Sequence, residues 1–174
     1  MNISKKELEE IIKLIAKQIS ENRNINFIFS KPWNNKYYIA LDSLKKLNLN
    51  ANAIISRELD ESHKLTIKAS CCWKEVIDFD ENKLDLISKN DTFFLDIKMK
   101  NIVNITMLNE DELESALAMK LFENGKNIYL WKETVKTVTG KEPEKYIKKL
   151  LNYYEEILSY GINIVDIEEV RNYE

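Results

Sequence analysis

Short apolar stretches alternate along this chain with segments whose apolar side chains recur at helical spacing. The short stretches are rich in β-branched and aromatic residues and are bounded by polar residues, as buried strands are. The segments between them place apolar residues on one face of a helix. Such an alternation favours right-handed βαβ units and a mostly parallel sheet. Strands are predicted at residues 26–30, 51–56, 75–79, 91–97 and 127–131, and helices at residues 36–47, 60–69, 111–124 and 143–160.

Glycine and proline residues mark the ends of the later helices. Gly125 stands where a C-terminal cap is expected, Pro143 occupies a first helical turn, and Gly161 ends the last helix. Residues 162–167 either add an edge strand or run across the surface. With 174 residues, the chain has room for one domain with a substantial core. We therefore predict a single-domain α/β protein with a three-layer, Rossmann-like or flavodoxin-like, doubly wound parallel sheet.

The N-terminal segment carries a pattern of its own. Ser4 and Glu7 form a capping box, and the apolar residues after them share one helical face. We divide the chain into an amphipathic helix at residues 1–20, a polar linker at 21–26 and an α/β domain at 27–174. Two interpretations of the helix stay open: it packs on its own domain, or it docks on another protein. A membrane surface is disfavoured because the polar face mixes Glu with Lys. The apolar face consists of Leu8, Ile11, Ile12, Ile15 and Ile19.

Composition excludes several functional classes. The net charge of −3 is interspersed along the chain and gives no electrostatic case for a nucleic-acid partner. No apolar run is long enough to cross a bilayer and the N-terminus lacks a secretory pattern, so we expect a cytoplasmic protein. Adjacent Cys71 and Cys72 neither staple a fold nor match a metal motif. The lone His63 argues against zinc and Ser–His–Asp chemistry, and no metal is expected, whereas carboxylate-based catalysis stays open.

The predicted fold locates the functional site at one edge of the sheet. In doubly wound sheets, ligands bind beyond the carboxyl ends of the strands, at a topological switch point. The loops that begin at Ser30, Ser56, Asp96 and Trp131 are therefore the places where chemistry is expected.

At these loops the chain resembles a known family of flavoproteins. The stretch from Thr92 to Leu130 reads TFFLDIKMKNIVNITMLNEDELESALAMKLFENGKNIYL, and an earlier helix reads YYIALDSLKKL. From about residue 26 to residue 132, this pattern is similar to the HFCD group, which includes phosphopantothenoylcysteine decarboxylase and the lantibiotic cysteine decarboxylases. The resemblance implies FMN bound between subunits and a homo-oligomer, a trimer or higher.

The resemblance also implies which residues face the flavin. The loop after the first strand would face its phosphate and ring, and the residues after the second strand would contact the phosphate. The segment from Lys98 to Asn101 stands in the flavin-edge loop, with Asn101 closest to an asparagine of the family. The implied cofactor-binding set is Ser30, Trp33, Asn34, Ser56, Arg57, Lys98 and Asn101.

Simpler structural interpretations stand beside these roles. Trp33 would stack on the isoalloxazine or contact a subunit, or else fold onto the surface. Ser56 and Arg57 would form a phosphate pair or a solvated strand end. Asp96, Lys98 and Lys100 would position a substrate or the flavin N1–C2=O edge, or else form a solvated loop of mixed charge. A cation at that edge would favour a reduced, anionic flavin.

The chain departs from the family at its phosphate loop and catalytic residues. The first loop has no glycine and carries Pro32 and Trp33, although glycines normally let backbone N–H groups approach a phosphate. The catalytic histidine of the decarboxylases has no counterpart, because His63 lies in another region. Cysteine decarboxylation is therefore not supported, the catalytic residues are unassigned, and flavin electron transfer is the more plausible reaction.

The tail carries a second, narrower resemblance. Residues 138–146 read VTGKEPEKY, and the helix after them ends at Tyr160-Gly161-Ile162. This is similar to a divergent branch of the same flavoproteins that is encoded among bacterial microcompartment genes in anaerobic bacteria. A capped amphipathic helix, a linker and a domain have the layout of an encapsulation peptide. The resemblance implies a location inside a bacterial microcompartment, with shell or cargo partners bound through residues 1–20.

Three hypotheses follow for function. The first is an FMN-binding flavoprotein that serves as a redox or accessory component of a microcompartment. The second is a flavin-free, non-catalytic homologue that acts as an assembly or interaction module. The third is a nucleotide or small-molecule sensor on the same scaffold, because fold does not fix function.

Overall fold

A six-stranded parallel sheet forms the centre of the computed structural model, which describes residues 4–21, 23–71 and 73–172. The strand order is β3-β2-β1-β4-β5-β6, and every neighbouring pair is parallel. The predicted doubly wound α/β fold is confirmed, with β6 as the added edge strand. The strands are β1 (Ile25–Phe29), β2 (Ala51–Ser56), β3 (Glu75–Phe79), β4 (Asp91–Phe94), β5 (Ile128–Trp131) and β6 (Asn163–Val165).

The switch point of the sheet lies beside β1. This strand pairs with β2 on one side, where Ile25 meets Ala51, and with β4 on the other, where Ile25 meets Asp91. Because the chain winds outward in both directions from β1, the loops after β1 and β4 diverge there. The carboxyl edge at this point is the expected binding crevice of such folds.

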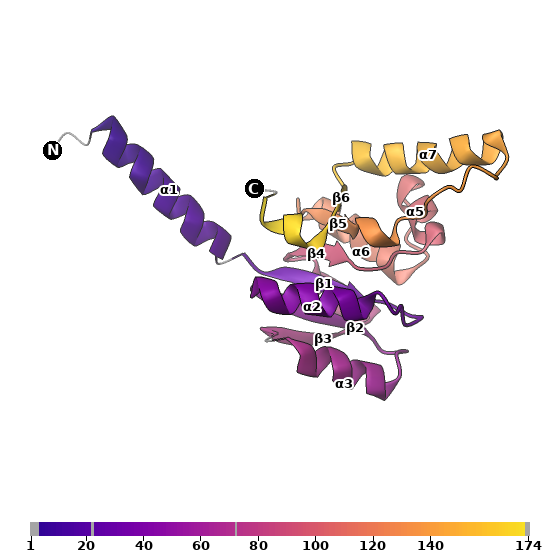
Figure 1. Ribbon diagram of the computed structural model, residues 1–174, viewed down its shortest axis with the longest axis horizontal. Helices are drawn as coiled ribbons and strands as arrows, with labels where there is room; N and C mark the ends of the chain where they lie inside the picture. The colour runs from indigo at the N-terminus through magenta and orange to yellow at the C-terminus, as the bar shows by residue number, and fades with distance from the viewer. Residues whose placement is uncertain (1–3, 22, 72, 173–174) are drawn as a thin grey trace.

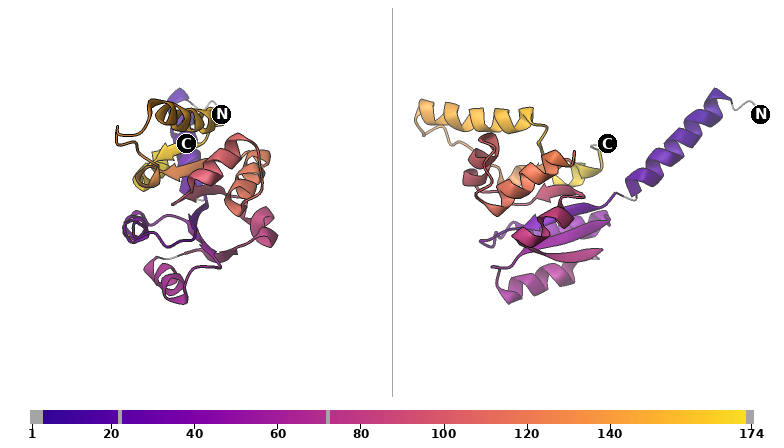
Figure 2. Two further views of the ribbon diagram at one scale, coloured as in Figure 1. Left: turned by 90° about the vertical axis from the view of Figure 1, so that its right-hand side faces the viewer. Right: turned by 180° about the vertical axis from the view of Figure 1, so that it is seen from behind.

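Helices cover both faces of the sheet (Figures 1 and 2). Helices α2, α3 and η3 pack on one face, whereas α4, α5 and α6 cover the other and α7 packs on α5. The α-helices are α1 (Lys5–Glu21), α2 (Tyr37–Leu47), α3 (Glu61–Ser70), α4 (Leu84–Ile87), α5 (Met99–Thr106), α6 (Leu113–Glu123) and α7 (Glu144–Ser159). The short 3₁₀ helices are η1 (Glu81–Lys83), η2 (Lys132–Thr134) and η3 (Ile167–Asn172).

The elements of the structure differ from the prediction in two strand bounds and two added helices. β1 begins at Ile25, inside the predicted linker, and β4 ends at Phe94 rather than residue 97. Two helices, α4 and α5, were not predicted. The residues predicted as a flavin-edge loop from Lys98 to Asn101 contain the N-cap and the first turn of α5 instead.

Helix α1 extends away from the domain, at the amino edge of the sheet (Figures 1 and 2). Its predicted capping box is present, because the Glu7 carboxylate accepts from the Ser4 N–H and hydroxyl at 2.8 Å each. The apolar side chains from Leu8 to Ile15 are exposed, with Ile12 at 56% and Ile11 at 42%. Ile19 was predicted on the same apolar face, but its side chain lies outside the part of the structure that is described.

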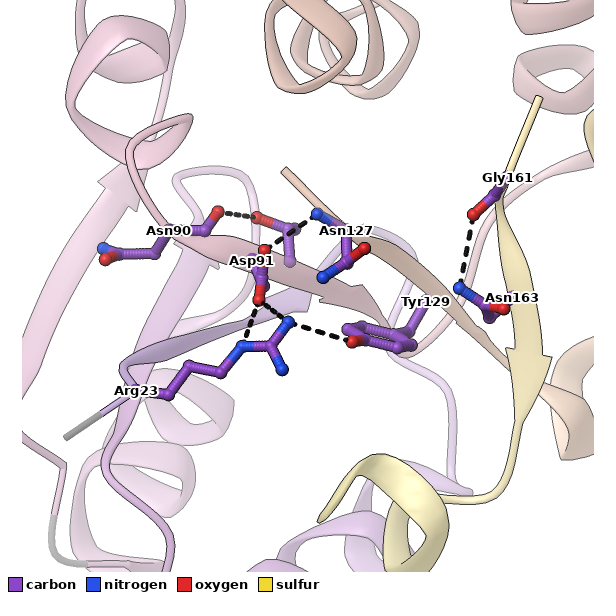
Figure 3. A network of polar contacts seen from close by, with 8 residues as sticks. Arg23, Asn90, Asp91, Asn127, Tyr129, Gly161 and Asn163 are labelled. Carbon is purple, nitrogen blue, oxygen red and sulfur yellow. Dashed lines mark hydrogen bonds and ion pairs between the residues drawn. The ribbon is translucent and has the colours of Figure 1, made fainter. Parts of the chain in front are cut away.

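A polar network fixes the chain just after α1 (Figure 3). Arg23 donates from Nε to the Asp91 carboxylate and from a terminal nitrogen to the Tyr129 hydroxyl at 3.3 Å. The other Asp91 oxygen accepts from the Asn127 N–H at 2.8 Å. These contacts connect the start of β1 to β4 and β5.

Within the described ranges, no helix combines the length and apolar character that a bilayer span requires.

Candidate functional site

Ser30 leads from β1 into the carboxyl-edge crevice and is almost fully buried. Its N–H donates to the Tyr37 hydroxyl at 3.1 Å, and that hydroxyl donates back to the Ser30 carbonyl at 3.0 Å. The Ser30 hydroxyl donates to Glu114 at 2.9 Å. The loop therefore starts from a fixed position, with its first N–H and hydroxyl hydrogen already used within the protein.

Trp33 is the central side chain of the loop. Its indole stacks flat on the His63 ring, with centroids 4.1 Å apart and planes 3° apart, and meets the Tyr37 ring edge-on at 5.2 Å. The indole thus fills space between the starts of α2 and α3, while Pro32, after a cis peptide bond, is exposed. The indole Nε1 is buried and has no hydrogen-bond partner among the described residues.

Asn34 joins the loop after β1 to the loop after β4. Its side-chain nitrogen donates to the Asp96 carboxylate at 3.0 Å, and its side-chain oxygen accepts from the Lys36 N–H at 3.0 Å. Asn34 therefore joins the two loops that diverge at the switch point.

Two carboxylates give this part of the crevice a negative potential. Burial raises the pKa of Tyr37 well above its usual value near 10, and the charges of Asp96 and Glu114 raise it further. Tyr37 therefore stays a neutral phenol and keeps its paired hydrogen bonds to Ser30. Neither Tyr37 nor Glu114 was predicted as a site residue.

Two lysines, Lys31 after β1 and Lys98 after β4, lie at the carboxyl edge of the sheet. Lys31 pairs with Glu58 at 2.6 Å, and this contact lowers the pKa of Glu58, with a smaller contribution from the charge of Lys98. Lys98 is exposed and has no ion pair within the described part of the chain. Glu58, which follows β2, thus lies near both lysines.

Ser56 and Arg57 lie at the end of β2, as predicted, but Arg57 turns toward β3. Its guanidinium pairs with Asp80 at 2.5 Å and approaches Asp78 at 3.8 Å. The Ser56 hydroxyl accepts from the Glu58 N–H at 3.3 Å. The two side chains therefore do not converge on one point in this structure.

Asn101 is buried in the first turn of α5, with 3% of its surface exposed. Its side-chain oxygen has no partner among the described residues. Lys98 is the N-cap of the same helix, and its carbonyl accepts from the Asn101 and Ile102 N–H groups. A cation that makes no ion pair in the described ranges and a buried acceptor thus belong to one helix start, where the helix dipole is positive.

The structure brings some predicted residues together and separates others. Ser30, Asn34 and Lys98 lie on the loops that meet at the switch point, whereas Arg57 is engaged with β3. His63, distant in sequence, stacks on Trp33. In the described ranges, no group of His, Cys, Asp and Glu side chains has the arrangement of a metal site.

Comparison with known proteins establishes the fold of the chain. No protein-family model matches the sequence, and a search of curated proteins found no match. A crystal structure of AnUbiX in complex with FMN and dimethylallyl pyrophosphate is similar, with a TM-score of 0.56 and 16% identity, covering 86% of each chain. Phenylacrylic acid decarboxylase from Aquifex aeolicus has a TM-score of 0.55 and 13% identity, covering 87% of this chain and 91% of that one.

A dodecameric FMN-dependent UbiX-like decarboxylase from Escherichia coli also has a TM-score of 0.55, at 12% identity, covering 83% of this chain and 79% of that one. At such identities the likeness concerns the fold alone. Of these three solved structures, one contains FMN and another is described as FMN-dependent.

Proposed function

We propose that the protein binds FMN at the carboxyl edge of its sheet and acts as a flavin-dependent redox or accessory protein. The observation that carries the proposal is the switch point between β1 and β4, where Asn34 and Asp96 join the two loops, in a fold shared with FMN-dependent proteins. Cofactors in doubly wound sheets bind at this place. When bound, FMN supplies hydride and electron transfer.

In the part of the proposed site that would face the FMN phosphate, side chains take the place of a glycine-rich turn. The buried indole N–H of Trp33 has no acceptor among the described residues. Lys31 is held by an exposed ion pair with Glu58, which contributes little to stability and can be exchanged for a phosphate contact. These donors fit an anionic group at the mouth of the crevice, and Ser56 and Arg57 border it.

The ring side relies on the start of α5. The unpartnered oxygen of Asn101 fits a ring N–H, and the positive end of the helix fits a carbonyl edge. Lys98 adds a charge that favours the reduced, anionic flavin. Ser30 and Asn34 shape the crevice through their bonds to Glu114 and Asp96. Electron transfer fits this set better than decarboxylation, because His63 is stacked on Trp33.

A specific observation favours the second candidate, a flavin-free assembly module. The Trp33–His63 stack fills the loop, and the Ser30 N–H is bonded to Tyr37. If the loop keeps this arrangement, it leaves no space for the FMN phosphate, and the Ser30 N–H cannot donate to that phosphate. The scaffold would then serve interactions alone.

We also retain a proposal about assembly and place. Helix α1 exposes the apolar side chains of Leu8, Ile11, Ile12 and Ile15, which fit a protein partner. Shell or cargo proteins of a bacterial microcompartment, bound through residues 1–20, are the partners that the sequence resemblance implies. One neighbour in the shared fold is dodecameric, which supports a homo-oligomer, a trimer or higher, for this chain as well.

An absorbance spectrum of the purified full-length protein tests the leading proposal. We expect flavin bands, FMN released on denaturation, and saturable binding when FMN is added to stripped protein. Lys98→Ala and Asn101→Ala should weaken binding about tenfold each, which corresponds to about 1.4 kcal/mol. Lys89→Ala, which removes an exposed lysine near the amino edge, is the matched control. A colourless protein that does not bind added FMN would support the assembly module instead.

A further inference from the structure

Helix α5 carries two buried asparagines that are three residues apart. Asn101 is 3% exposed and Asn104 is 9% exposed, although asparagine side chains usually lie at the surface of a protein. The side-chain oxygen of Asn101 and the side-chain nitrogen of Asn104 are both buried without a hydrogen-bond partner among the described residues. One side of α5 therefore presents an acceptor and a donor that the described chain does not satisfy.

The core contacts of α5 do not require these two amides. Ile102 and Ile105 are 1% and 0% exposed, and they pack in the apolar core between the helices and the sheet. A buried amide group without a partner destabilises the folded state, because it has lost its hydrogen bonds to water. A ligand that supplies the missing partners would recover this loss.

The spacing of the two asparagines suits a single ligand. Residues three apart on a helix have Cβ atoms roughly 5–6 Å apart, so the ends of Asn101 and Asn104 can contact neighbouring atoms of one group. A ring N–H donates to the Asn101 oxygen, and a carbonyl beside it accepts from the Asn104 nitrogen. The pair thus matches a ring in which an N–H and a carbonyl are adjacent.

Contacts of neighbouring residues place this side of α5 toward the switch point. Lys100 lies one turn before Asn104 on the same side of the helix and pairs with Glu112, the N-cap of α6. Glu114, in the first turn of α6, accepts from the Ser30 hydroxyl, which follows β1. The side of α5 that carries Asn104 therefore faces the start of α6, and α6 there contacts the carboxyl end of β1.

We propose that Asn101 and Asn104 bind an imide edge, in which a ring N–H is flanked by two carbonyl groups. The isoalloxazine ring of FMN has such an edge, and so does the uracil ring of a uridine nucleotide. The inference rests on the proposed flavin site and names the part of the ligand that α5 recognises, with Asn104 as the added donor. The contact sets which ring binds and takes no part in a reaction step.

Paired ligands test the proposal on the purified full-length protein. In 3-methyl-FMN a methyl group replaces the imide hydrogen, so we expect this analogue to bind about tenfold more weakly than FMN. Asn101→Ala should bind the two flavins alike, because the acceptor is gone. UMP and CMP carry the same ribose phosphate, but only UMP has the imide, so they test a nucleotide as the source of the edge. We expect FMN to bind and UMP not to bind at the same concentrations.

Isosteric variants separate the acceptor from the donor. Asn101→Asp keeps an oxygen acceptor and should retain FMN binding within about threefold, whereas Asn104→Asp replaces a donor with an acceptor and should weaken binding about tenfold. Asn152→Asp, at an exposed asparagine of α7, is the matched control and should leave binding unchanged. Because Asn104→Asp can also impair folding, the side-chain NH₂ resonances of Asn104 in the wild-type protein provide a second readout. They should shift when FMN is added.

The possible results distinguish this inference from the flavin proposal. Equal affinity for FMN and 3-methyl-FMN, with unchanged Asn104 side-chain resonances, would overturn the imide contact and leave the flavin site standing. Binding of UMP but not of CMP, in a protein that does not bind FMN, would support imide recognition and reject the flavin site. A protein that binds none of these ligands would overturn both.

Discussion

At the scale of single residues, Tyr37 fixes the backbone at the carboxyl end of β1. Its hydroxyl accepts from the Ser30 N–H and donates to the Ser30 carbonyl, so one side chain satisfies both backbone groups at the end of β1. Burial and two nearby carboxylates oppose its ionisation. The geometry of the loop therefore depends on a phenol that stays neutral.

The raised pKa of Tyr37 predicts how stability depends on alkaline pH. The unfolded chain loses this proton near pH 10, whereas the folded chain holds it at higher pH. The contribution of Tyr37 is thus fully present below pH 10 and falls as pH rises above it. Urea unfolding between pH 8 and pH 11 should show a smaller loss of stability for Tyr37→Phe than for the wild type. Equal slopes in both proteins would contradict this, and Tyr38→Phe is the exposed control.

The Arg23–Asp91 pair predicts a second effect at this scale. Asp91→Asn removes the charge that holds Arg23 and weakens the bond to the Asn127 N–H (Figure 3). We expect a loss of about 1–2 kcal/mol in the free energy of unfolding, measured in urea. Asp85→Asn, which breaks the exposed pair with Lys120, should leave that free energy unchanged within error. Equal effects of both substitutions would show that the pair does not anchor the chain.

The sequence predicts which residues reach the site edge better than it predicts their contacts. Ser30 and Asn34 follow a strand, so their position follows from the fold alone. The turn of Arg57 toward Asp80 depends on the loop after β3, and the stack of Trp33 on His63 depends on the packing of α3. Such contacts join segments far apart in the chain and leave no local pattern.

At the scale of elements, long periodic segments were predictable and short ones were not. α6 and α7 have clear helical periodicity and glycine ends, and the structure places them close to the predicted bounds. α5 reads MKNIVNIT, in which β-branched residues favour strands, and its helix depends on packing against α6 and α7. α4 has only four residues, too few for a period to be visible.

The capping box of α1 predicts an effect confined to one element. The hydrogen bond from the Ser4 N–H, and to a smaller extent the bond from the Ser4 hydroxyl, lowers the pKa of Glu7. The stabilisation by this cap is therefore fully present above pH 4.5 and is lost as the pH falls through the lowered pKa. Ser4→Ala should speed amide exchange in the first turn of α1 severalfold at neutral pH. Exchange in β1 and β4 should not change, because α1 is outside the core. Faster exchange throughout the sheet would instead make α1 part of the folding unit.

At the scale of the whole molecule, the two edges of the sheet have different roles. The loops of the proposed flavin site lie at the carboxyl edge. Arg23 binds Asp91 at the amino edge, and α1 extends away from the domain there (Figure 1). The fold follows from the alternating pattern of the sequence. The function follows less directly, because the loop after β1 has no glycine that would let backbone N–H groups approach a phosphate.

This separation of the edges predicts that flavin binding and assembly are independent. FMN in excess should raise the melting temperature of the full-length protein, because a ligand that binds only the folded state stabilises it. The same rise should occur in the Ile12→Lys variant, which alters only α1. A rise that disappears in this variant would mean that the site requires the partner of α1. Lys98→Ala should reduce the rise in both backgrounds.

The most direct test of the flavin site is a map of backbone amide chemical shifts on titration with FMN. We predict that the largest changes fall on residues 30–36, 56–58 and 96–101, and that the Trp33 indole N–H shifts with them. The chemical shifts of the amides around Arg23 and Asp91 should not change. Changes at the amino edge alone, or no saturable change at any residue, would contradict an FMN site between β1 and β4.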